Sequence, residues 1–444
     1  MTQVPPRWLD TRLRLAKLVR RAVDHVFPDH WSFMLGEIAL YSFVVLVITG
    51  TFLAMFFKGG SGHVIYHGSY RPLDGRHMSE AYRSVLHISF DVPAGLLIRQ
   101  IHHWAANVFV AAILAHLSRI FFTAAYRRPR EINWLIGLTL LVLALANGFF
   151  GYSICDDLLS GAGLRVGYAI VLSIPIIGPW LAFLFFGAAP PADTIIPRFY
   201  ALHIFLVPAL ITLLVGAHLA IIWRQMHTNY PGPKRTDTTI VGSRLWPSYT
   251  LKSLGLFFLV FGTLAGLGAL VQIDPIWVYG PNDPAAILPG AQPDWYLGWV
   301  EGAMRLFPGI NLRLGHWLVP ELFFPAILFP GLIFLFLYSW PWIDKLIFFD
   351  FREHHVLRLP WQQPFNTALG SSLIMMMLVL LFAGGDDVIA IATDTSVVDI
   401  RILLRILFFI APAIAGLTTY ALCRWKLNRH LQAAKLAPAQ EEHA

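Results

Sequence analysis

Residues 93–124 read PAGLLIRQIHHWAANVFVAAILAHLSRIFFTA, an apolar stretch in which His102 and His116 stand 14 residues apart. The stretch is long enough to cross a bilayer as an α-helix. On such a helix 14 residues make about 3.9 turns, so the two histidines face roughly the same way, about 21 Å apart along the axis. Ionisable residues inside a membrane span usually serve a function. This stretch therefore predicts a functional membrane helix that presents histidines at two depths.

A second apolar stretch repeats the arrangement. Residues 198–226 carry His203 and His218, which are 15 residues apart. Two such helices side by side offer one histidine each at two depths, and this is the ligand set for two six-coordinate haems stacked across a bilayer. A lone buried histidine is more often a hydrogen-bonding or proton-handling group. Four histidines at matched spacing favour haem ligation instead.

His103 stands beside His102, and spacing alone leaves a choice between them. His102 gives the 14-residue interval, so we assign it as the ligand. We expect His103 to point elsewhere and to hydrogen-bond locally.

The composition indicates an integral membrane protein. The 444-residue chain is 57% hydrophobic and 13% charged, whereas about a quarter of the residues of a soluble domain are charged. It has two cysteines, Cys155 and Cys423, and no C-x-x-C-H motif, which excludes covalent c-type haem and argues against cysteine-ligated iron–sulfur or zinc sites. The net charge of +7 arises from basic residues in short loops beside apolar runs. That pattern reflects membrane orientation and argues against nucleic-acid binding.

The pattern of apolar runs predicts an all-α membrane fold with about eight transmembrane helices. Residues 7–27 carry five basic residues among leucine, valine and phenylalanine, which is typical of an amphipathic surface helix. An apolar stretch at 168–189 is broken by Pro175, Gly178 and Pro179, and we interpret it as a re-entrant or surface hairpin. The first apolar run begins near residue 33 and is a full span long, so we expect no cleavable signal peptide. The predicted spans lie near residues 32–57, 93–124, 133–154, 198–226, 250–271, 317–340, 367–383 and 401–423.

Charge also predicts the orientation. The terminal segments and alternate loops are basic, and the opposite loops are rich in aspartate. By the positive-inside rule both termini are cytoplasmic. His102 and His203 then form an outer pair, and His116 and His218 form an inner pair. We divide the chain into an N-terminal surface helix (1–30), a four-helix bundle for two b-type haems (31–240), a C-terminal membrane part (241–424) with an outer loop (272–316), and a cytoplasmic tail (425–444).

Glycines repeat the histidine interval. Because glycine has no side chain, a flat macrocycle can lie against the backbone there. Glycine also serves close helix packing in membranes, but two pairs at this interval favour haem clearance. The pairs are Gly36 with Gly50 and Gly137 with Gly151, each 14 residues apart.

Two arginines lie one turn from the histidines of residues 93–124. Arg99 precedes His102 by three residues, and Arg119 follows His116 by three. A buried arginine is costly without an anion, and a haem propionate could supply one in bidentate geometry. The alternative is that each arginine reaches toward lipid phosphate.

These histidine and glycine pairs, together with the tetrapeptide Pro293-Asp294-Trp295-Tyr296, make the chain resemble cytochrome b of the cytochrome bc complexes over nearly its whole length. Many members of that family have Pro-Glu-Trp-Tyr at this point, lining the outer quinol-oxidation site. Stretches such as ISFDVPAGLLIRQIHHW (88–104) and IIPRFYALH (195–203) are similar to the actinobacterial branch.

The resemblance implies a respiratory quinol–cytochrome c reductase in the plasma membrane. It implies that menaquinol, or another quinol, is oxidised near Asp294 and Tyr296. Electrons would pass through two haems b to an inner quinone site, coupled to proton translocation. It also implies a Rieske-type iron–sulfur subunit, a cytochrome c subunit of the dihaem type, association with a cytochrome c oxidase, and a homodimeric complex.

Asp294 is the expected proton acceptor from quinol. A free aspartate has a pKa of about 3.9, and we expect desolvation in an apolar pocket to raise it. The alternative is a loop aspartate that caps the short helix after it.

The chain departs from the family in three places. Many relatives have proline where this chain has Cys155. Mitochondrial relatives have an aspartate after the lysine of the fifth span, where this chain reads Lys252-Ser253. They also have a histidine a few residues after the second-pair ligand, and the nearest one here is His227. We take His227, Lys252 and Ser253 as candidates for the inner quinone site.

Two other classes of protein could carry intramembrane histidines. A dihaem anchor of a dehydrogenase would be shorter, with four or five spans, and would not explain the Pro-Asp-Trp-Tyr loop. A transporter would use the histidines as a proton relay, and the 14-residue intervals would be coincidence. A visible absorption spectrum of the purified protein decides between haem ligation and a transporter, because it shows either reduced b-type haem bands, two per chain, or none.

Overall fold

The computed structural model describes residues 7–436 apart from 14, 287, 289 and 316. Within these residues, eight helical segments are long and apolar enough to cross a membrane, so the predicted all-α membrane fold is confirmed. The segments are Trp31–Ala54, Gly95–Phe122, Glu131–Ser153, Ile195–Gln225, Leu245–Leu270, Phe324–Phe348, Pro364–Gly384 and Val397–Ala433.

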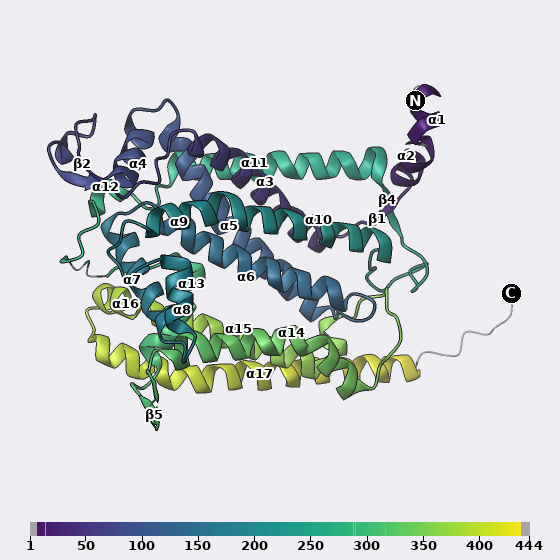
Figure 1. The fold of residues 1–444 in the computed structure, drawn as a ribbon. Coiled ribbons are helices and arrows are strands. Elements are labelled where there is room, and N and C mark those ends of the chain that lie inside the picture. Colours follow the sequence, from purple (N-terminus) through teal and green to yellow (C-terminus); the bar gives the residue numbers. More distant parts are fainter. Residues whose placement is uncertain (1–6, 14, 287, 289, 316, 437–444) are drawn as a thin grey trace.

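The helices run side by side in Figure 1, and short elements cover their ends. The long helices are α3 (Met34–Ala54), α5 (Gly95–Phe122), α6 (Glu131–Ser153), α10 (Val207–Gln225), α11 (Thr250–Leu270), α14 (Phe329–Phe348), α15 (Pro364–Gly384) and α17 (Val397–Leu436). The shorter ones are α1 (Arg7–Leu13), α2 (Leu15–Val23), α4 (Glu80–Phe90), α7 (Leu158–Leu172), α8 (Gly178–Phe186), α9 (Ile195–Ala201), α12 (Ile276–Tyr279), α13 (Trp295–Leu306) and α16 (Asp386–Thr393). Among the described residues, three two-stranded ribbons pair β1 (Val26–Pro28) with β4 (Gly242–Arg244), β2 (His63–Ile65) with β3 (His77–Ser79), and β5 (Leu312–Leu314) with β6 (Trp317–Val319).

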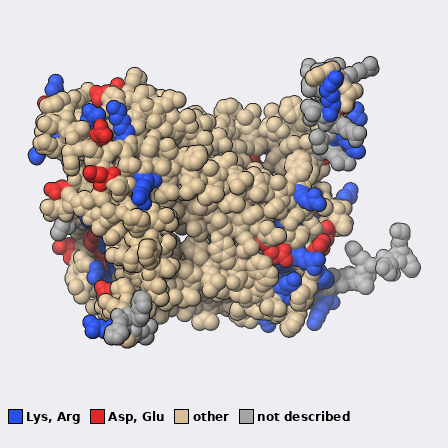
Figure 2. All heavy atoms as spheres, in the orientation of Figure 1, with Lys and Arg blue, Asp and Glu red and all other residues tan. Residues whose placement is uncertain are grey.

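The charged residues lie mainly at the two ends of the helices. Figure 2 shows lysine, arginine, aspartate and glutamate gathered at both ends of this face, with a broad middle zone that is almost free of them. The helices α1 and α2 and the C-terminal end of α17 lie at one end, whereas α4, α7, α12 and α16 lie at the other (Figure 1). An apolar zone between two charged ends is what a bilayer requires of a multi-pass protein.

A buried cluster joins the four helices that carry the histidine and glycine pairs. Phe43 of α3, Phe109 of α5, Leu141 of α6 and Ile211 of α10 belong to it. Tyr296 of α13 packs into the same cluster at 3% exposure. The packing therefore brings the Pro-Asp-Trp-Tyr segment against the bundle.

The sixth predicted span begins later than expected. Trp317–Val319 forms β6, and the helical segment runs from Phe324 to Phe348 instead of 317–340. Val319 precedes Pro320, and a residue before proline avoids the helical conformation. Pro325 is tolerated because it falls in the first turn of the segment, where no intrahelical donor is lost.

The stretch predicted as a hairpin forms two short helices, α7 and α8. Neither helix is long enough to cross a membrane. The first begins before the predicted stretch, at Leu158, because Asp157 and Ser160 form a capping box there.

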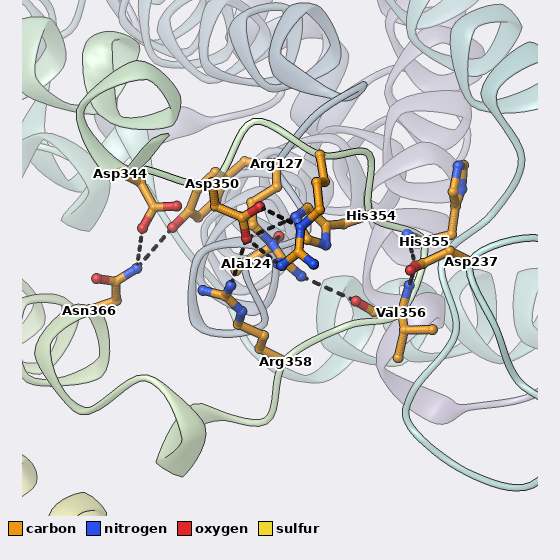
Figure 3. Close-up of polar contacts among 12 residues, drawn as sticks. Ala124, Arg127, Asp237, Asp344, Asp350, His354, His355, Val356, Arg358 and Asn366 are labelled. Atoms are coloured by element: carbon orange, nitrogen blue, oxygen red, sulfur yellow. Dashed lines mark hydrogen bonds and ion pairs between the residues drawn. The ribbon is translucent and has the colours of Figure 1, made fainter. Parts of the chain in front are cut away.

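A polar cluster fastens two loops at the end where α17 finishes (Figure 3). Asp350, in the loop after α14, lies 3.0 Å from both His354 Nε2 and Arg358 Nη2. Arg127, in the loop between α5 and α6, donates to the carbonyl of Val356 over 3.2 Å and lies 3.9 Å from the Asp350 carboxylate. These contacts tie the basic α5–α6 loop to the second half of the chain.

Candidate functional site

The four histidines lie in the two predicted pairs. The ring centroids of His102 and His203 are 6.1 Å apart, with an angle of 80° between the ring planes. His116 and His218 are close enough to interact electrostatically. Each pair joins α5 to the segment Ile195–Gln225, so the structure brings together the residues that the spacing predicted.

A π-helical turn explains why the second interval is one residue longer. The segment η3 (Leu202–Leu206) includes His203, and the Val207 amide donates to the Leu202 carbonyl, five residues back. Pro208 follows and has no N–H to donate, so the ordinary helical pattern cannot continue through it. A π-turn takes up one extra residue. The 15-residue interval therefore places both histidines on the same face, as 14 residues do on α5.

Each of the four glycines lies against one histidine ring. A Cβ atom added to Gly50 or Gly36 would lie 3.1 Å from Cε1 of His102 or His116, respectively. On Gly151 it would lie 2.8 Å from Nδ1 of His203, whereas on Gly137 it would lie 3.8 Å from Cε1 of His218. The direct reason for the glycines is thus room for the imidazole rings, and the constraint is tightest at Gly151 and loosest at Gly137.

The two pairs differ at the ring nitrogens. His203 Nδ1 donates to the Asn147 carbonyl over 3.0 Å, which leaves its Nε2 lone pair free. Among the described residues, Nδ1 of His116 and Nδ1 of His218 are buried without a hydrogen-bond partner. Imidazoles with a free Nε2, packed in facing pairs, are the donor set that a six-coordinate haem iron requires.

Both arginines have buried donor atoms without a partner among the described residues. Arg99 is 9% exposed, and its Nη2 donates to the Asp274 carbonyl over 3.0 Å. Arg119 lies 4.2 Å from the Phe33 ring centroid. Within the described part of the chain, Nε of both arginines and Nη2 of Arg119 are buried without a partner. Buried guanidinium donors require an anionic acceptor, and the propionates of a haem would fit.

A cavity of about 410 Å³ connects the outer pair to the Pro-Asp-Trp-Tyr segment. His102 and His203 line it together with Gly50 and Gly151. Its lining also includes Asp294, Tyr296, His103, Tyr152, Asp274 and Arg99. Space for a cofactor at the outer pair is therefore continuous with space for a substrate beside Asp294.

Asp294 is the centre of a polar network in this cavity. Its Oδ1 lies 2.9 Å from His103 Nε2, and its Oδ2 accepts the Tyr296 hydroxyl over 2.8 Å. The carboxylate is thus occupied by two side chains rather than by the first turn of α13, which disfavours the helix-cap interpretation. The expectation that His103 hydrogen-bonds locally is wrong, since its partner is 191 residues away.

The expectation that the pKa of Asp294 is raised is also wrong. Burial does raise the pKa of the carboxyl. The charge of His103 and the hydrogen bonds from His103 and Tyr296 outweigh that effect, and the pKa falls below its ordinary value. Asp294 is therefore ionised at neutral pH.

The three inner-site candidates do not form one cluster. Lys252 Nζ lies 2.8 Å from Asp29 in a half-exposed ion pair. Ser253 donates to Glu37 Oε2 over 2.6 Å. His227 packs against Phe27 at a centroid distance of 4.5 Å, and burial lowers its pKa to about 4, with His25 and Arg130 acting in the same direction. His227 and Ser253 therefore lie in different surroundings from Lys252.

Glu37 is a polar residue that the sequence analysis missed. Its carboxylate accepts hydrogen bonds from Ser253, from Tyr249 over 2.5 Å and from Tyr41 over 3.2 Å. Phe27 stacks on Tyr249 at 4.1 Å and also contacts His227. An acidic residue inside an apolar span was a signal that could have identified it.

Comparisons of sequence and structure match this chain to known proteins. A family model described as cytochrome b(N-terminal)/b6/petB matches residues 107–281. The chain is 45% identical over 417 residues to the cytochrome bc1 complex cytochrome b subunit of Streptomyces coelicolor, which covers 94% of this chain and 76% of that protein. It is 46% identical over 416 residues to the subunit of the same name from Mycobacterium tuberculosis, with the same shares covered. A solved structure of a hyperthermophilic respiratory Complex III has the same fold, with a TM-score of 0.68 at 19% identity, covering 93% of this chain and 98% of that chain.

Proposed function

Since this chain belongs to the cytochrome b subunits of cytochrome bc1 complexes, we propose that it oxidises menaquinol at an outer site and reduces quinone at an inner site, with proton translocation. It is a subunit of a quinol–cytochrome c oxidoreductase. The actinobacterial relatives and the cavity beside Asp294 support the choice of substrate and site.

Two haems b would be held by the outer and inner pairs. The free Nε2 of His203, the glycines against the rings and the unsatisfied donors of Arg99 and Arg119 support this assignment. When bound, the haems would supply one-electron carriers at two depths of the membrane. The histidines would ligate and orient them, and Arg99 and Arg119 would compensate the charge of their propionates.

Asp294 and Tyr296 would act on the quinol. The ionised carboxylate can accept a hydrogen bond and then a proton from a quinol hydroxyl. Tyr296 holds the carboxylate from one side, and His103 holds it from the other.

The inner quinone site would lie around Glu37, Ser253 and His227. The hydroxyl groups around Glu37 and the buried Nε2 of His227, which has no partner within the described part of the chain, offer polar groups on both sides of Phe27. Lys252 lies farther out, in a half-exposed ion pair with Asp29.

The remaining parts of the proposal concern partners and orientation. We propose that a Rieske-type iron–sulfur subunit takes one electron from each quinol and passes it to a dihaem cytochrome c subunit. The complex would be a homodimer associated with a cytochrome c oxidase. The basic loops at the end where α17 finishes support a cytoplasmic location for both termini in the plasma membrane.

The two facing histidine pairs carry the proposal, and redox titration of the purified complex tests it. We expect two b-type components. His102→Leu and His203→Leu should remove the same component, and His116→Leu and His218→Leu should remove the other. A wild-type protein without haem b, or loss of one component from both His102→Leu and His116→Leu, would contradict the assignment.

A further inference from the structure

We propose that Thr49 is a positioning residue that fixes the tautomer of His102 and thereby sets the redox potential of the outer iron. The inference rests on the proposed ligation of haem by the outer pair. It concerns a residue of α3 that is not itself a ligand.

Thr49 lies immediately before Gly50, on the face of α3 that meets His102. It is 6% exposed, and its Oγ1 is 2.8 Å from His102 Nδ1. The backbone at Gly50 lets the ring approach, since a Cβ there would lie 3.1 Å from Cε1 of the same ring. Thr49 and Gly50 therefore both lie against the Nδ1–Cε1 edge of the His102 imidazole.

The direction of this hydrogen bond follows from the second contact of the threonine. Thr49 Oγ1 donates to the Val45 carbonyl over 2.7 Å, and a hydroxyl has one proton to donate. Toward His102 the oxygen can therefore only accept. His102 must then carry its proton on Nδ1, and its Nε2 is left with the lone pair that binds a metal.

The other three histidines lack a comparable side chain. The backbone carbonyl of Asn147 fixes the tautomer of His203, and no substitution at Asn147 would remove that carbonyl. Nδ1 of His116 and His218 has no partner among the described residues. The backbone of Leu46 also contacts His102, so Thr49 supplies the side-chain part of this contact, which a substitution can remove without touching the ligand.

An acceptor on Nδ1–H increases the basicity of a metal-bound imidazole. A more basic ligand stabilises the oxidised iron, so hydrogen bonding is one of the factors that set the potential of haem. Loss of the Thr49 hydroxyl should therefore raise the midpoint potential of the outer component. It should leave the inner component unchanged, because His116 and His218 are far from Thr49 along the helices.

The test compares three variants in the whole complex. Thr49→Val keeps the shape and removes the acceptor, and Thr49→Ser keeps the hydroxyl. Ser42→Ala is the matched control, because Ser42 is also buried on α3 and donates to a carbonyl four residues back, that of Ile38, over 2.8 Å. The midpoint potentials of both b-type components are measured by redox titration, and His102→Leu identifies the outer one.

We expect Thr49→Val to change the ratio of oxidised to reduced outer haem at a fixed potential by about tenfold, which is about 59 mV for one electron. Thr49→Ser and Ser42→Ala should match the wild type. Loss of the outer haem from Thr49→Val, with both haems retained in Ser42→Ala and Thr49→Ser, would also support the positioning role.

Three results would overturn the inference. The first is a Thr49→Val protein with both haems at wild-type potentials. The second is an equal shift in Ser42→Ala, which would show a general effect of losing a buried hydroxyl. The third is an equal loss or shift in Thr49→Ser. Absence of haem b from the wild type would instead refute the proposed function, so the two failures can be told apart.

Discussion

The outer and inner pairs have the same ligands in the sequence but different surroundings in the structure. In the outer pair, Nδ1 of both histidines is hydrogen-bonded, by Thr49 and by the Asn147 carbonyl. In the inner pair, neither Nδ1 has a partner among the described residues. The outer pair also opens onto the cavity that contains Asp294. A repeated ligand spacing therefore specifies two similar metal sites, and the groups behind the ligands make the two sites different.

The largest expected effect distinguishes the two pairs on one helix, α6. Gly151→Val should remove almost all outer haem, because the new side chain would overlap the His203 ring. Gly137→Val should have the smallest effect of the four glycines, because an added Cβ meets His218 at an ordinary contact distance of 3.8 Å. Haem content per chain, measured by spectroscopy, checks the order.

Gly262→Val is the control for that experiment, because an added Cβ on Gly262 of α11 meets nothing within 4 Å. It should insert normally and keep both haems. Equal haem loss in Gly137→Val and Gly151→Val would refute the predicted difference. Full occupancy in both would favour simple helix packing.

The second prediction concerns the cavity that adjoins the outer pair. Asp294→Asn cannot accept a proton and should slow quinol oxidation by roughly 10²–10⁴, the usual loss for a general base. Both haems should remain. Asp294→Glu should keep most activity. Electron transfer from quinol to cytochrome c in membranes measures the effect, and wild-type turnover in Asp294→Asn would exclude a role for the carboxylate.

The pH dependence of this step has a defined sign. The Asp294 pKa is lowered, so its proton-accepting form exists above that pKa and is lost as the pH falls through it. Between pH 5 and 8 the titration of Asp294 should therefore leave quinol oxidation unchanged. A wild-type rate that rises with pH inside that range, when the rate of Asp294→Asn does not, would contradict the lowered pKa of Asp294.

Glu37→Gln should affect the inner side and spare the outer one. The amide keeps most hydrogen bonds but cannot exchange a proton, so we expect reoxidation of the inner haem by quinone to slow by about tenfold or more. Reduction of the outer haem by quinol should not change. Glu131→Gln, at the start of α6, is a control acid at the same end of the helices. Unaltered inner-haem reoxidation in Glu37→Gln would leave Glu37 with a structural role alone.

The smallest expected effect is on stability at acid pH. Burial lowers the pKa of His227 to about 4, with His25 and Arg130 contributing. Between about pH 6.5 and 4 the unfolded chain takes up a proton that the folded chain does not, so folding loses stability as the pH falls. Thermal unfolding of His227→Gln should be less sensitive to acid than that of the wild type. His77→Gln, an exposed histidine on β3, should behave like the wild type.

Much of the membrane fold was predictable because its signals are local. Span length and apolar content identify the eight helices, and the 14-residue intervals identify the faces of α3, α5 and α6 that meet the cofactor region. The sixth span was misplaced because Pro320 and the β5–β6 ribbon act against a helix that composition alone would favour. The 15-residue interval could not be interpreted from spacing alone, because the π-turn at η3 takes up its extra residue.

The sequence by itself determined the membrane class, the four histidines and the glycines opposite them, because helical periodicity relates residues a few turns apart. Tertiary structure alone decided that His103 meets Asp294, that Glu37 meets Ser253, and that Thr49 holds His102. It also decided the sign of the Asp294 pKa shift, which depends on the balance between burial and the charge of His103. These partners lie between 53 and 216 residues apart in the chain. No local periodicity encodes such contacts, because they arise when separate helices pack and place their polar groups together.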